Sequence, residues 1–250
     1  MIKASHLTKS YGPFQALNDV SFEIQKGEVV GFLGVNGAGK TTTMRILTGY
    51  YQPDSGDAWV AGHSILSDTM GVKKSIGYLP ETPPLYLDMN VEAYLQFVLE
   101  LKRVPKNDRP ALLEWALNKC GLAERRRSVI RNLSKGFRQR VGLAQAIIHR
   151  PPVIILDEPT VGLDPLQIIE IRSLIKELGG EHTVLLSTHI LSEVMATCQR
   201  VIMIHRGHMV HDMKIQDLGQ KKSLEELFME VVTKDEAAIL SEKQKRASVA

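Results

Sequence analysis

The stretch Val29-Val-Gly-Phe-Leu-Gly-Val-Asn-Gly-Ala-Gly-Lys-Thr41 decides how the rest of the sequence is interpreted. It opens with a nearly continuous apolar run, Val29 to Leu33, which is typical of a strand buried on both faces of a sheet. A helix is predicted from Lys40 to about Leu47, with Gly49 as its end. The residues from Gly34 to Thr41 fit the pattern GxxxxGK(S/T) at every fixed position. The sequence therefore predicts a strand, a glycine-rich loop and a helix in direct succession.

This loop has the composition of a phosphate-binding site. Its glycines let backbone N–H groups converge on phosphate oxygens without side-chain clashes, and the following helix adds a partial positive charge. Lys40 is placed to reach the outer phosphates, and the Thr41 hydroxyl can ligate Mg²⁺. The alternative is a glycine-rich turn that merely precedes a helix, which the predicted strand and helix disfavour. The loop alone indicates nucleotide binding without specifying the nucleotide or its use.

Buried strands and helices alternate further along the chain. Val153 to Leu156 and Thr183 to Leu186 are apolar runs, and Leu166 to Leu178 between them has helical spacing. This order predicts a parallel sheet with crossover helices. The expected apolar side of the helix consists of Ile168, Ile169, Ile171, Leu174, Ile175 and Leu178.

Other regions have different patterns. The first 35 residues are typical of short strands joined by turns, and Arg200 to Val210 is typical of a two-stranded hairpin. From Pro80 to about His149 the character changes, because Val91 to Leu101 and Ala111 to Leu117 have apolar residues at helical spacing. We expect a mostly helical insert there. The last ~20 residues are charged and are expected to be helical or frayed, as chain ends often are.

Composition narrows the class of protein. The 250 residues include 44% hydrophobic and 24% charged residues, which is ordinary for a globular protein. The net charge of +3 is too small to argue for a nucleic-acid partner. Isolated Cys120 and Cys198 and scattered histidines disfavour a disulfide scaffold or a zinc site. No run approaches the ~20 apolar residues of a spanning helix, and no signal-peptide core follows Met1, so we expect any membrane association to require a partner.

Two acidic residues, Asp157 and Glu158, stand at the end of one predicted strand. Such a pair usually caps a helix or ends a strand in solvent. Strand ends beside a phosphate loop, however, form the active-site edge of an α/β sheet. There Asp157 would hold Mg²⁺ and Glu158 would polarise the attacking water as a general base. His189 follows another predicted strand, where either a structural role or a γ-phosphate contact is open.

The segment Leu133-Ser-Lys-Gly-Phe-Arg-Gln-Arg140 carries the most specific similarity. It resembles the LSGGQ signature of ABC ATPases, in the Leu-Ser-Lys-Gly form common among ABC-2-type exporter subunits. Gly162-Leu-Asp-Pro165 resembles the D-loop of that family, His189 its switch histidine, and Tyr11 its adenine-stacking aromatic residue. The resemblance covers Ile2 to about Asp212.

Within the family, the sequence is most similar to ATP-binding subunits of the gliding-motility and nitrous-oxide-reductase-maturation types. The segments that carry this similarity are Ile76-Gly-Tyr-Leu-Pro-Glu81, Arg138-Gln-Arg-Val-Gly-Leu-Ala-Gln-Ala146 and Ser187-Thr-His-Ile-Leu191. The resemblance implies an α/β fold: a P-loop NTPase (RecA-like) core with a mostly parallel sheet, an N-terminal antiparallel β subdomain and a helical subdomain insert. It implies an ABC ATPase domain over residues 1–220, with the insert at about 82–149, and a short helical or frayed tail over 221–250.

The resemblance also implies ATP and Mg²⁺ as cofactors. Glu158 and His189 would be catalytic, and Thr41, Glu81 and Asp157 would surround the metal. The nucleotide would contact Tyr11, Asn36, Gly37, Ala38, Gly39, Lys40, Thr41, Thr42, Ser134 and Gly136.

Family resemblance further implies a head-to-tail dimer with a second copy of the chain. ATP on the loop of one copy would be covered by Ser134 and Gly136 of the other, at a helix N-terminus. Hydrolysis would let the halves part. A transmembrane permease would convert this cycle into transport, with export as the expected direction, and would hold the chain at the cytoplasmic face of the cell membrane.

Three positions depart from the commonest family pattern. Lys135 replaces the first signature glycine, which is tolerable if its side chain points away from the phosphate. Phe137 replaces the usual signature glutamine, while Gln139 lies two residues later. Glu81 stands where the family has glutamine, and it adds a negative charge near the phosphates. Glu81 is thus open to two interpretations: a metal ligand, or only a link between subdomains.

The start of the insert is where the family docks its membrane subunit. Pro83-Pro84-Leu85-Tyr86 with Tyr94, Phe97 and Val98 could line a groove for a partner helix, but we favour Phe97 and Val98 as core of the insert. The run Arg125-Arg126-Arg127 is interpreted as a solvated loop, with lipid headgroup contact as the minor alternative.

Two other classes of function compete. A soluble ABC ATPase acting on nucleic acid or the ribosome would carry a long coiled coil or two ATPase units; neither pattern is present, so no nucleic acid is expected. A nucleotide-binding regulator without turnover would not need the general base Glu158. A transport ATPase remains the leading hypothesis.

Overall fold

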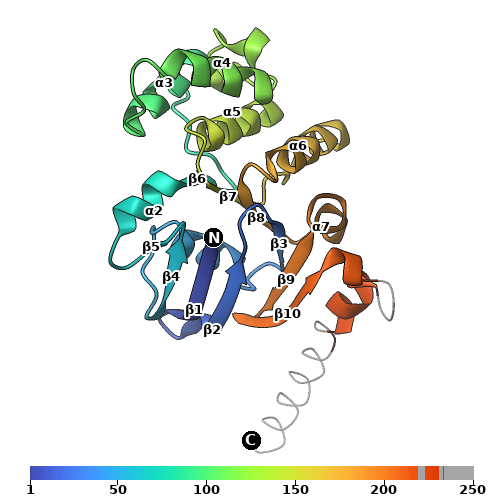
Figure 1. Cartoon of the computed structure of the whole chain (residues 1–250). Helices are drawn as coiled ribbons and strands as arrows, with labels where there is room; N and C mark the ends of the chain where they lie inside the picture. Colours follow the sequence, from blue (N-terminus) through green and yellow to red (C-terminus); the bar gives the residue numbers. More distant parts are fainter. Residues whose placement is uncertain (219–222, 231–232, 234–250) are drawn as a thin grey trace, which may run out of the picture.

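A computed structural model describes residues 1–218, 223–230 and 233 of the chain. The described residues form a four-stranded antiparallel sheet, ordered β2-β1-β4-β5, and a six-stranded sheet, ordered β10-β9-β3-β8-β7-β6 (Figure 1). Most of the predicted tail, 221–250, lies outside the described residues. The strands are β1 (Ile2–Tyr11), β2 (Phe14–Ile24), β3 (Val29–Leu33), β4 (Ser55–Val60), β5 (His63–Ser64), β6 (Ile76–Leu79), β7 (Val153–Asp157), β8 (Thr183–Thr188), β9 (Arg200–His205) and β10 (His208–Lys214).

Helices surround these sheets. The α-helices are α1 (Lys40–Leu47), α2 (Thr69–Ser75), α3 (Val91–Leu101), α4 (Arg109–Lys119), α5 (Lys135–Ile147), α6 (Pro165–Leu178) and α7 (Leu191–Thr197), with 3-10 turns at Ala123–Arg125, Ile130–Asn132 and Ile215–Asp217. The larger sheet is parallel from β9 to β6, and only β10 runs antiparallel. The expected α/β core and antiparallel N-terminal sheet are confirmed.

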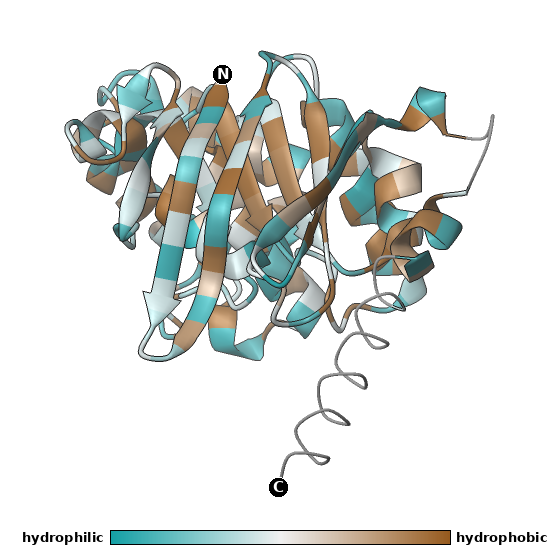
Figure 2. Ribbon diagram, turned by 90° about the horizontal axis from the view of Figure 1, so that it is seen from below, coloured by the Kyte–Doolittle hydropathy of each residue, from teal (hydrophilic) through white to brown (hydrophobic). Residues whose placement is uncertain are grey.

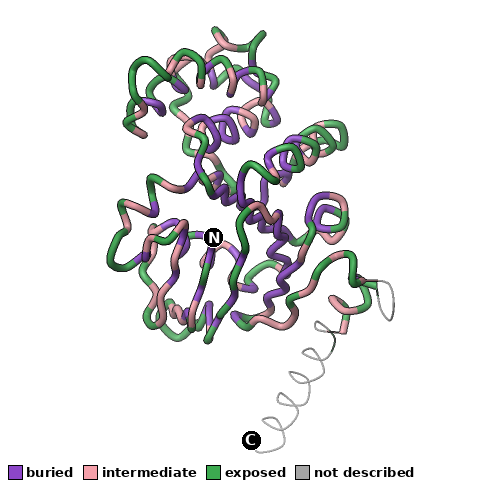
Figure 3. Tube along the Cα trace, viewed as in Figure 1, coloured by how far each residue is buried: buried purple, intermediate pink, exposed green. Residues whose placement is uncertain are grey.

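The central strands are apolar throughout because both faces of the sheet are covered. Along β7, Val153 and Ile155 join the core that includes α1 and the smaller sheet, whereas Ile154 and Leu156 join the core under α3 to α7. Figure 3 shows these strands buried between the two layers. The smaller sheet is covered on one face only, and β1, which starts at the N-terminus in Figure 2, accordingly alternates in hydropathy.

Helices α3 and α4 lie at the top of Figure 1, and α5 below them packs against β6 of the larger sheet. The predicted helices at Val91–Leu101 and Ala111–Leu117 correspond to α3 and α4. Within the insert Val98 is core, as favoured, but Phe97 is 37% exposed, so its core assignment is wrong. Phe97 instead packs edge-on against Tyr86, with ring centroids 5.4 Å apart.

Helix α6 also corrects an expectation. Ile171, Leu174, Ile175 and Leu178 are buried, but Ile169 is 61% exposed. Ile168 and Ile169 are adjacent in sequence and therefore point in different directions from the helix axis. The predicted apolar side of α6 is thus wider than the surface that the helix buries. The predicted apolar side is therefore right for its second half and wrong at Ile169.

Candidate functional site

Three parallel strands end at the same edge of the large sheet, where the chemistry-bearing loops begin. Leu33 pairs with Thr188, and Asp157 pairs with Ser187. Gly34 N–H then donates to the Thr188 carbonyl at 3.3 Å. This register brings together the loop after β3, the acidic pair after β7 and the histidine after β8.

The glycines of the loop are required by its path. Gly37 and Gly39 have φ of +80° and +109°, a region that side chains disfavour. A Cβ on Gly39 would also meet the Ala16 carbonyl oxygen at 2.6 Å, and one on Gly34 would overlap the Ile204 carbonyl. The loop borders an open cavity of about 370 Å³. The cavity is lined by Tyr11, Phe14, Ala16, Asn36, Gly37, Gly39, Lys40, Thr41, Thr42, Glu81, Glu158, Val161 and His189.

Lys40 lies folded into this loop. Its Nζ donates to the Gly34 carbonyl at 2.8 Å and to the Val35 carbonyl at 3.2 Å. The same Nζ lies 3.2 Å from Glu158 Oε1, and both side chains are less than a tenth exposed. The ammonium therefore lies between the loop carbonyls and the carboxylate of Glu158, the candidate general base.

Asp157 is 1% exposed and accepts two hydroxyl hydrogen bonds. Thr41 Oγ1 donates to Asp157 Oδ1 at 3.3 Å, and Ser187 Oγ donates to the same oxygen. Sequence reasoning missed Ser187, because its position opposite Asp157 depends on the register between β7 and β8. Hydroxyl and carboxylate oxygens are the donors that Mg²⁺ takes. Among the described residues no cluster of three or more His, Cys, Asp or Glu could hold a metal, so such an ion would also need phosphate oxygens.

Glu158 is held by three neighbours. Its φ is +50°, an uncommon value for a non-glycine residue, and its N–H donates to the Ser187 carbonyl at 3.0 Å. Its Oε2 lies 2.9 Å from Nδ1 of His189, opposite the contact with Lys40. The carboxylate is thus fixed between an ammonium and an imidazole at the cavity wall.

Tyr11 and Glu81 lie at the open side of the cavity. Tyr11 is 41% exposed and packs edge-on against Tyr51, with centroids 6.0 Å apart. Phe14, which sequence reasoning missed, lines the same cavity and is 58% exposed. Glu81 is exposed and lines both this cavity and the neighbouring one that reaches Arg138. Tyr11 and Phe14 therefore give the open side of the cavity an aromatic surface, and Glu81 gives it a carboxylate.

Ser134 and Gly136 are not brought to this cavity. Ser134 caps α5 by accepting from Phe137 N–H at 3.4 Å and is exposed. Gly136 is buried, and a Cβ there would overlap the Gln167 side chain. Neither residue lines the cavity beside the glycine-rich loop. In one chain, the two predicted parts of the nucleotide site are separate.

The departures from the family pattern have local explanations. The Lys135 side chain lies against Gly162, in the loop that precedes α6, so it points into its own chain. Gln139 is buried and donates from Nε2 to the Pro159 carbonyl at 2.9 Å. It thereby attaches α5 to the segment just after Glu158.

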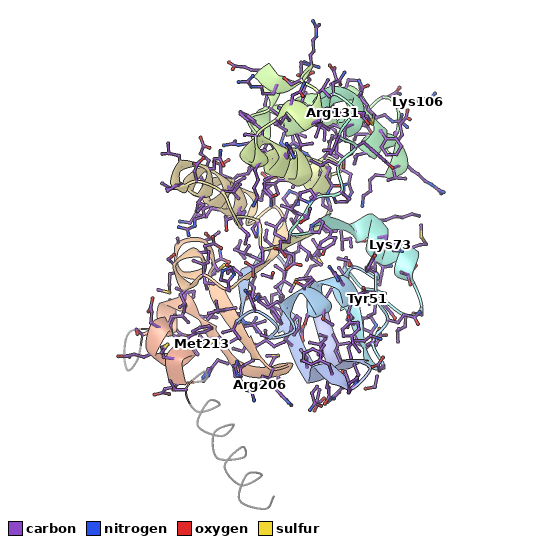
Figure 4. All side chains as sticks on the ribbon, turned by 180° about the vertical axis from the view of Figure 1, so that it is seen from behind. Tyr51, Lys73, Lys106, Arg131, Arg206 and Met213 are labelled. Atoms are coloured by element: carbon purple, nitrogen blue, oxygen red, sulfur yellow. The ribbon has the colours of Figure 1, made fainter. Side chains whose placement is uncertain are left out.

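A third hollow, which we call the basic groove, lies between α1, α2 and β6 on one side and the insert on the other and has a volume of about 750 Å³. Its described lining residues include no Asp or Glu. Burial lowers the pKa of Lys102 to about 8, and burial lowers that of His149 to about 3. Figure 4 shows Lys73 on α2, facing the insert that carries Lys106. The lining consists of Arg45, Thr48, Tyr50, Met70, Lys73, Lys74, Ile76, Gly77, Tyr78, Pro80, Thr82, Pro84, Leu101, Lys102, Arg103, Gln145 and His149.

Two of the three arginines in the run 125–127 make contacts within the chain. Arg126 donates to Glu92 at 2.6 Å and to Glu114 at 2.9 Å, and Arg125 lies 5.3 Å from the Phe137 ring centroid. These contacts favour the solvated-loop interpretation over lipid contact.

Comparisons with known proteins agree with this geometry. Residues 17–161 match the family model described as ABC transporter. The chain is 40% identical to an uncharacterized ABC transporter ATP-binding protein of Methanocaldococcus jannaschii, over 88% of this chain and 80% of that protein. It is 34% identical to a bacitracin transport ATP-binding protein of Bacillus licheniformis, over 97% and 78%.

A solved dimeric ATP-binding cassette in a post-hydrolysis state, bound to ADP and Pi, superposes with a TM-score of 0.79 at 25% identity, covering 86% of this chain and 99% of that one. Within the part of the chain that the structure describes, no helix has the length and apolar character needed to cross a membrane. The family match, the strand-loop-helix and the acidic pair lead to one conclusion: the chain is an ATP-binding, ATP-hydrolysing member of the ABC transporter family.

Proposed function

We propose that this chain powers a membrane exporter by hydrolysing ATP between two copies of itself. The observation that carries the proposal is the placement of Glu158, whose carboxylate lies between Lys40 and His189 at the cavity beside the glycine-rich loop. The site residues take the roles predicted from the sequence. The domain division is also kept as proposed: 1–220 for the ATPase, with its insert at about 82–149, and 221–250 for the tail.

Glu158 acts as the general base in this proposal. Its two oxygens contact different groups, Lys40 at 3.2 Å and His189 at 2.9 Å. A bound terminal phosphate competes for the Lys40 ammonium and so frees one oxygen of Glu158 to accept a proton from water. His189 keeps the carboxylate oriented from the other side.

Thr41, Asp157 and Glu81 would hold Mg²⁺, which when bound would neutralise negative charge on the phosphates. The Thr41 and Asp157 oxygens are already 3.3 Å apart, and Ser187 holds Asp157 from behind. Glu81 is the outer and most exposed of the three. We therefore assign Thr41 and Asp157 as the inner pair.

The second half of the site comes from a second copy. Ser134 is exposed at the N-terminus of α5 but lies away from its own chain's nucleotide cavity. Helix N-termini favour anions, so this surface suits the outer phosphates held by a facing chain. The dimeric arrangement of the ADP- and Pi-bound cassette supports this proposal.

The permease contacts the basic groove in this proposal. Lys73, Lys74 and Arg103 line the groove together with apolar Met70 and Leu101, which suits an amphipathic segment with acidic side chains. Docking there would hold the chain at the cytoplasmic face of the membrane. Export is proposed from the resemblance to exporter subunits, supported by the relative named for bacitracin transport.

One experiment tests the proposal. The tagged chain is purified from detergent-solubilised membranes of its source, and its ATPase activity and bound membrane protein are measured. We expect a multi-span membrane protein to co-purify with wild type and with Lys106→Glu, an exposed position outside the groove, but not with Lys73→Glu/Lys74→Glu. Equal recovery with all three chains would contradict groove docking, and recovery of RNA or DNA in place of a membrane protein would favour the nucleic-acid class.

A further inference from the structure

Glu193 is a buried carboxylate that none of the roles above uses. It lies on α7, is 1% exposed, and belongs to no cavity wall beside the glycine-rich loop. Burying a carboxylate is strongly unfavourable unless the carboxylate is hydrogen-bonded or paired with a positive charge. Its contacts therefore indicate what holds it there.

Each oxygen of Glu193 accepts a hydrogen bond from a hydroxyl in a different active-site segment. Thr160 Oγ1 donates to Oε1, and Thr188 Oγ1 donates to Oε2 at 2.7 Å. Thr160 stands two residues after Glu158, and Thr188 directly precedes His189. One carboxylate thus joins the two segments that present the 2.9 Å contact between Glu158 and His189.

Glu193 also contacts the element that follows the 162–165 loop. Arg172 Nη2, on α6, lies 3.7 Å from Glu193 Oε1. Thr160 precedes that loop and α6 begins at Pro165, so both sides of the loop are attached to Glu193.

We propose that Glu193 is a positioning residue for ATP hydrolysis, whose carboxylate holds the Glu158 and His189 segments in register and connects both to the 162–165 loop. This inference rests on the proposed function of Glu158. Glu193 acts through Thr160 and Thr188 and touches no reacting atom. Displacing a catalytic group by about 1 Å can cost on the order of 10²-fold in rate, so loss of either hydroxyl contact should slow turnover.

Isosteric threonine variants test this without changing charge. Thr160→Val and Thr188→Val each remove one hydroxyl that donates to Glu193, and Thr197→Val is the matched control. Thr197 lies on the same helix and is buried, and its hydroxyl has no hydrogen-bond partner among the described residues. We expect kcat to fall about tenfold in Thr160→Val, as one lost hydrogen bond allows, and at least as far in Thr188→Val, whose hydroxyl also accepts from the Ile190 N–H at 3.0 Å. KM for ATP should stay within about twofold in both. Thr197→Val should keep the wild-type kcat.

Two further variants separate positioning from a general loss of folding. Thr188→Ser restores the hydroxyl and should recover kcat. The kcat of the double variant Glu193→Gln/Thr188→Val should be no lower than that of Glu193→Gln alone, because both substitutions remove the same contact between Thr188 and Glu193. Wild-type kcat in Thr160→Val and Thr188→Val, with only a lower melting temperature, would overturn the inference. If Glu158→Gln also kept wild-type turnover, the proposed function itself would fail instead.

Discussion

The nucleotide-loop side of the molecule and the signature side differ in how complete they are within one chain. On the loop side, Lys40, Asp157 and Glu158 are buried. Lys40 already contacts Glu158, and Thr41 of the loop already donates a hydrogen bond to Asp157. On the signature side, Ser134 is exposed, and among the described residues its hydroxyl hydrogen-bonds within its own helix. One half of the site is preorganised by folding, and in the proposed dimer the other half would present its donors to a second chain.

The largest effect is expected from removing the general base. Glu158→Gln keeps the shape of the side chain but removes the proton acceptor, so kcat should fall about 10³-fold while ATP still binds. The bound ATP should then hold the dimer closed, which size-exclusion chromatography with ATP would detect. Normal turnover in this variant would show that the base lies elsewhere.

A smaller loss is expected at Lys40. Lys40→Ala removes the ammonium that is expected to contact the phosphates. Because charge-assisted hydrogen bonds are lost, we expect ATP to bind about a hundredfold more weakly. Equilibrium titration with a fluorescent ATP analogue measures this, with Lys106→Ala as the control for a charge lost at an exposed position outside the cavity. Wild-type affinity in Lys40→Ala would remove the basis for the loop assignment.

The smallest effect concerns how the signature side is attached to the core. Helix α5 begins beside Ser134, and just after its other end His149 Nε2 contacts the Ile76 carbonyl at 3.1 Å. Burial lowers the pKa of His149 to about 3, so below pH 6.5 the unfolded chain binds a proton that the folded chain does not. The free energy of unfolding should therefore fall as pH falls.

His149→Gln keeps a donor for Ile76 and removes the titration. Between pH 6.5 and 5, wild type should lose about 2 kcal/mol more stability than this variant, measured by urea unfolding at each pH. Parallel pH profiles of the two proteins would contradict a neutral, buried His149.

Much of the fold could be predicted because its signals are local. The run from Val29 to Leu33 and the helix from Lys40 to Leu47 follow from buried-strand composition and a glycine-rich loop. Ser187 and Glu193 could not be found this way, since their importance comes from register and from α7 packing behind two loops. Ile169 was wrongly predicted to be buried, because the spacing of apolar residues along a helix does not determine how much of the helix surface packs against the core.

The separation of the two halves is likewise invisible in sequence spacing. The family resemblance predicts a site shared by Lys40 of one copy and Ser134 of the other, and Ser134 lies outside the cavity that Lys40 of its own chain lines. The arrangement of α5 relative to the sheet accounts for this separation. The proposed domain boundaries and residue roles stay predictions until they are measured.

Mixing two inactive variants tests most directly whether the halves combine between chains. Lys40→Ala disables the loop half, and Ser134→Asp places a carboxylate against the phosphate while still capping α5, at an expected cost of about 10²-fold in kcat. A mixed dimer then holds one intact site, built from the loop of one chain and the signature of the other. We predict that an equal mixture recovers about a quarter of wild-type ATPase activity, since half of the dimers are mixed and each has one of two sites. Activity that stays at the average of the two separate variants would contradict a site shared between two chains.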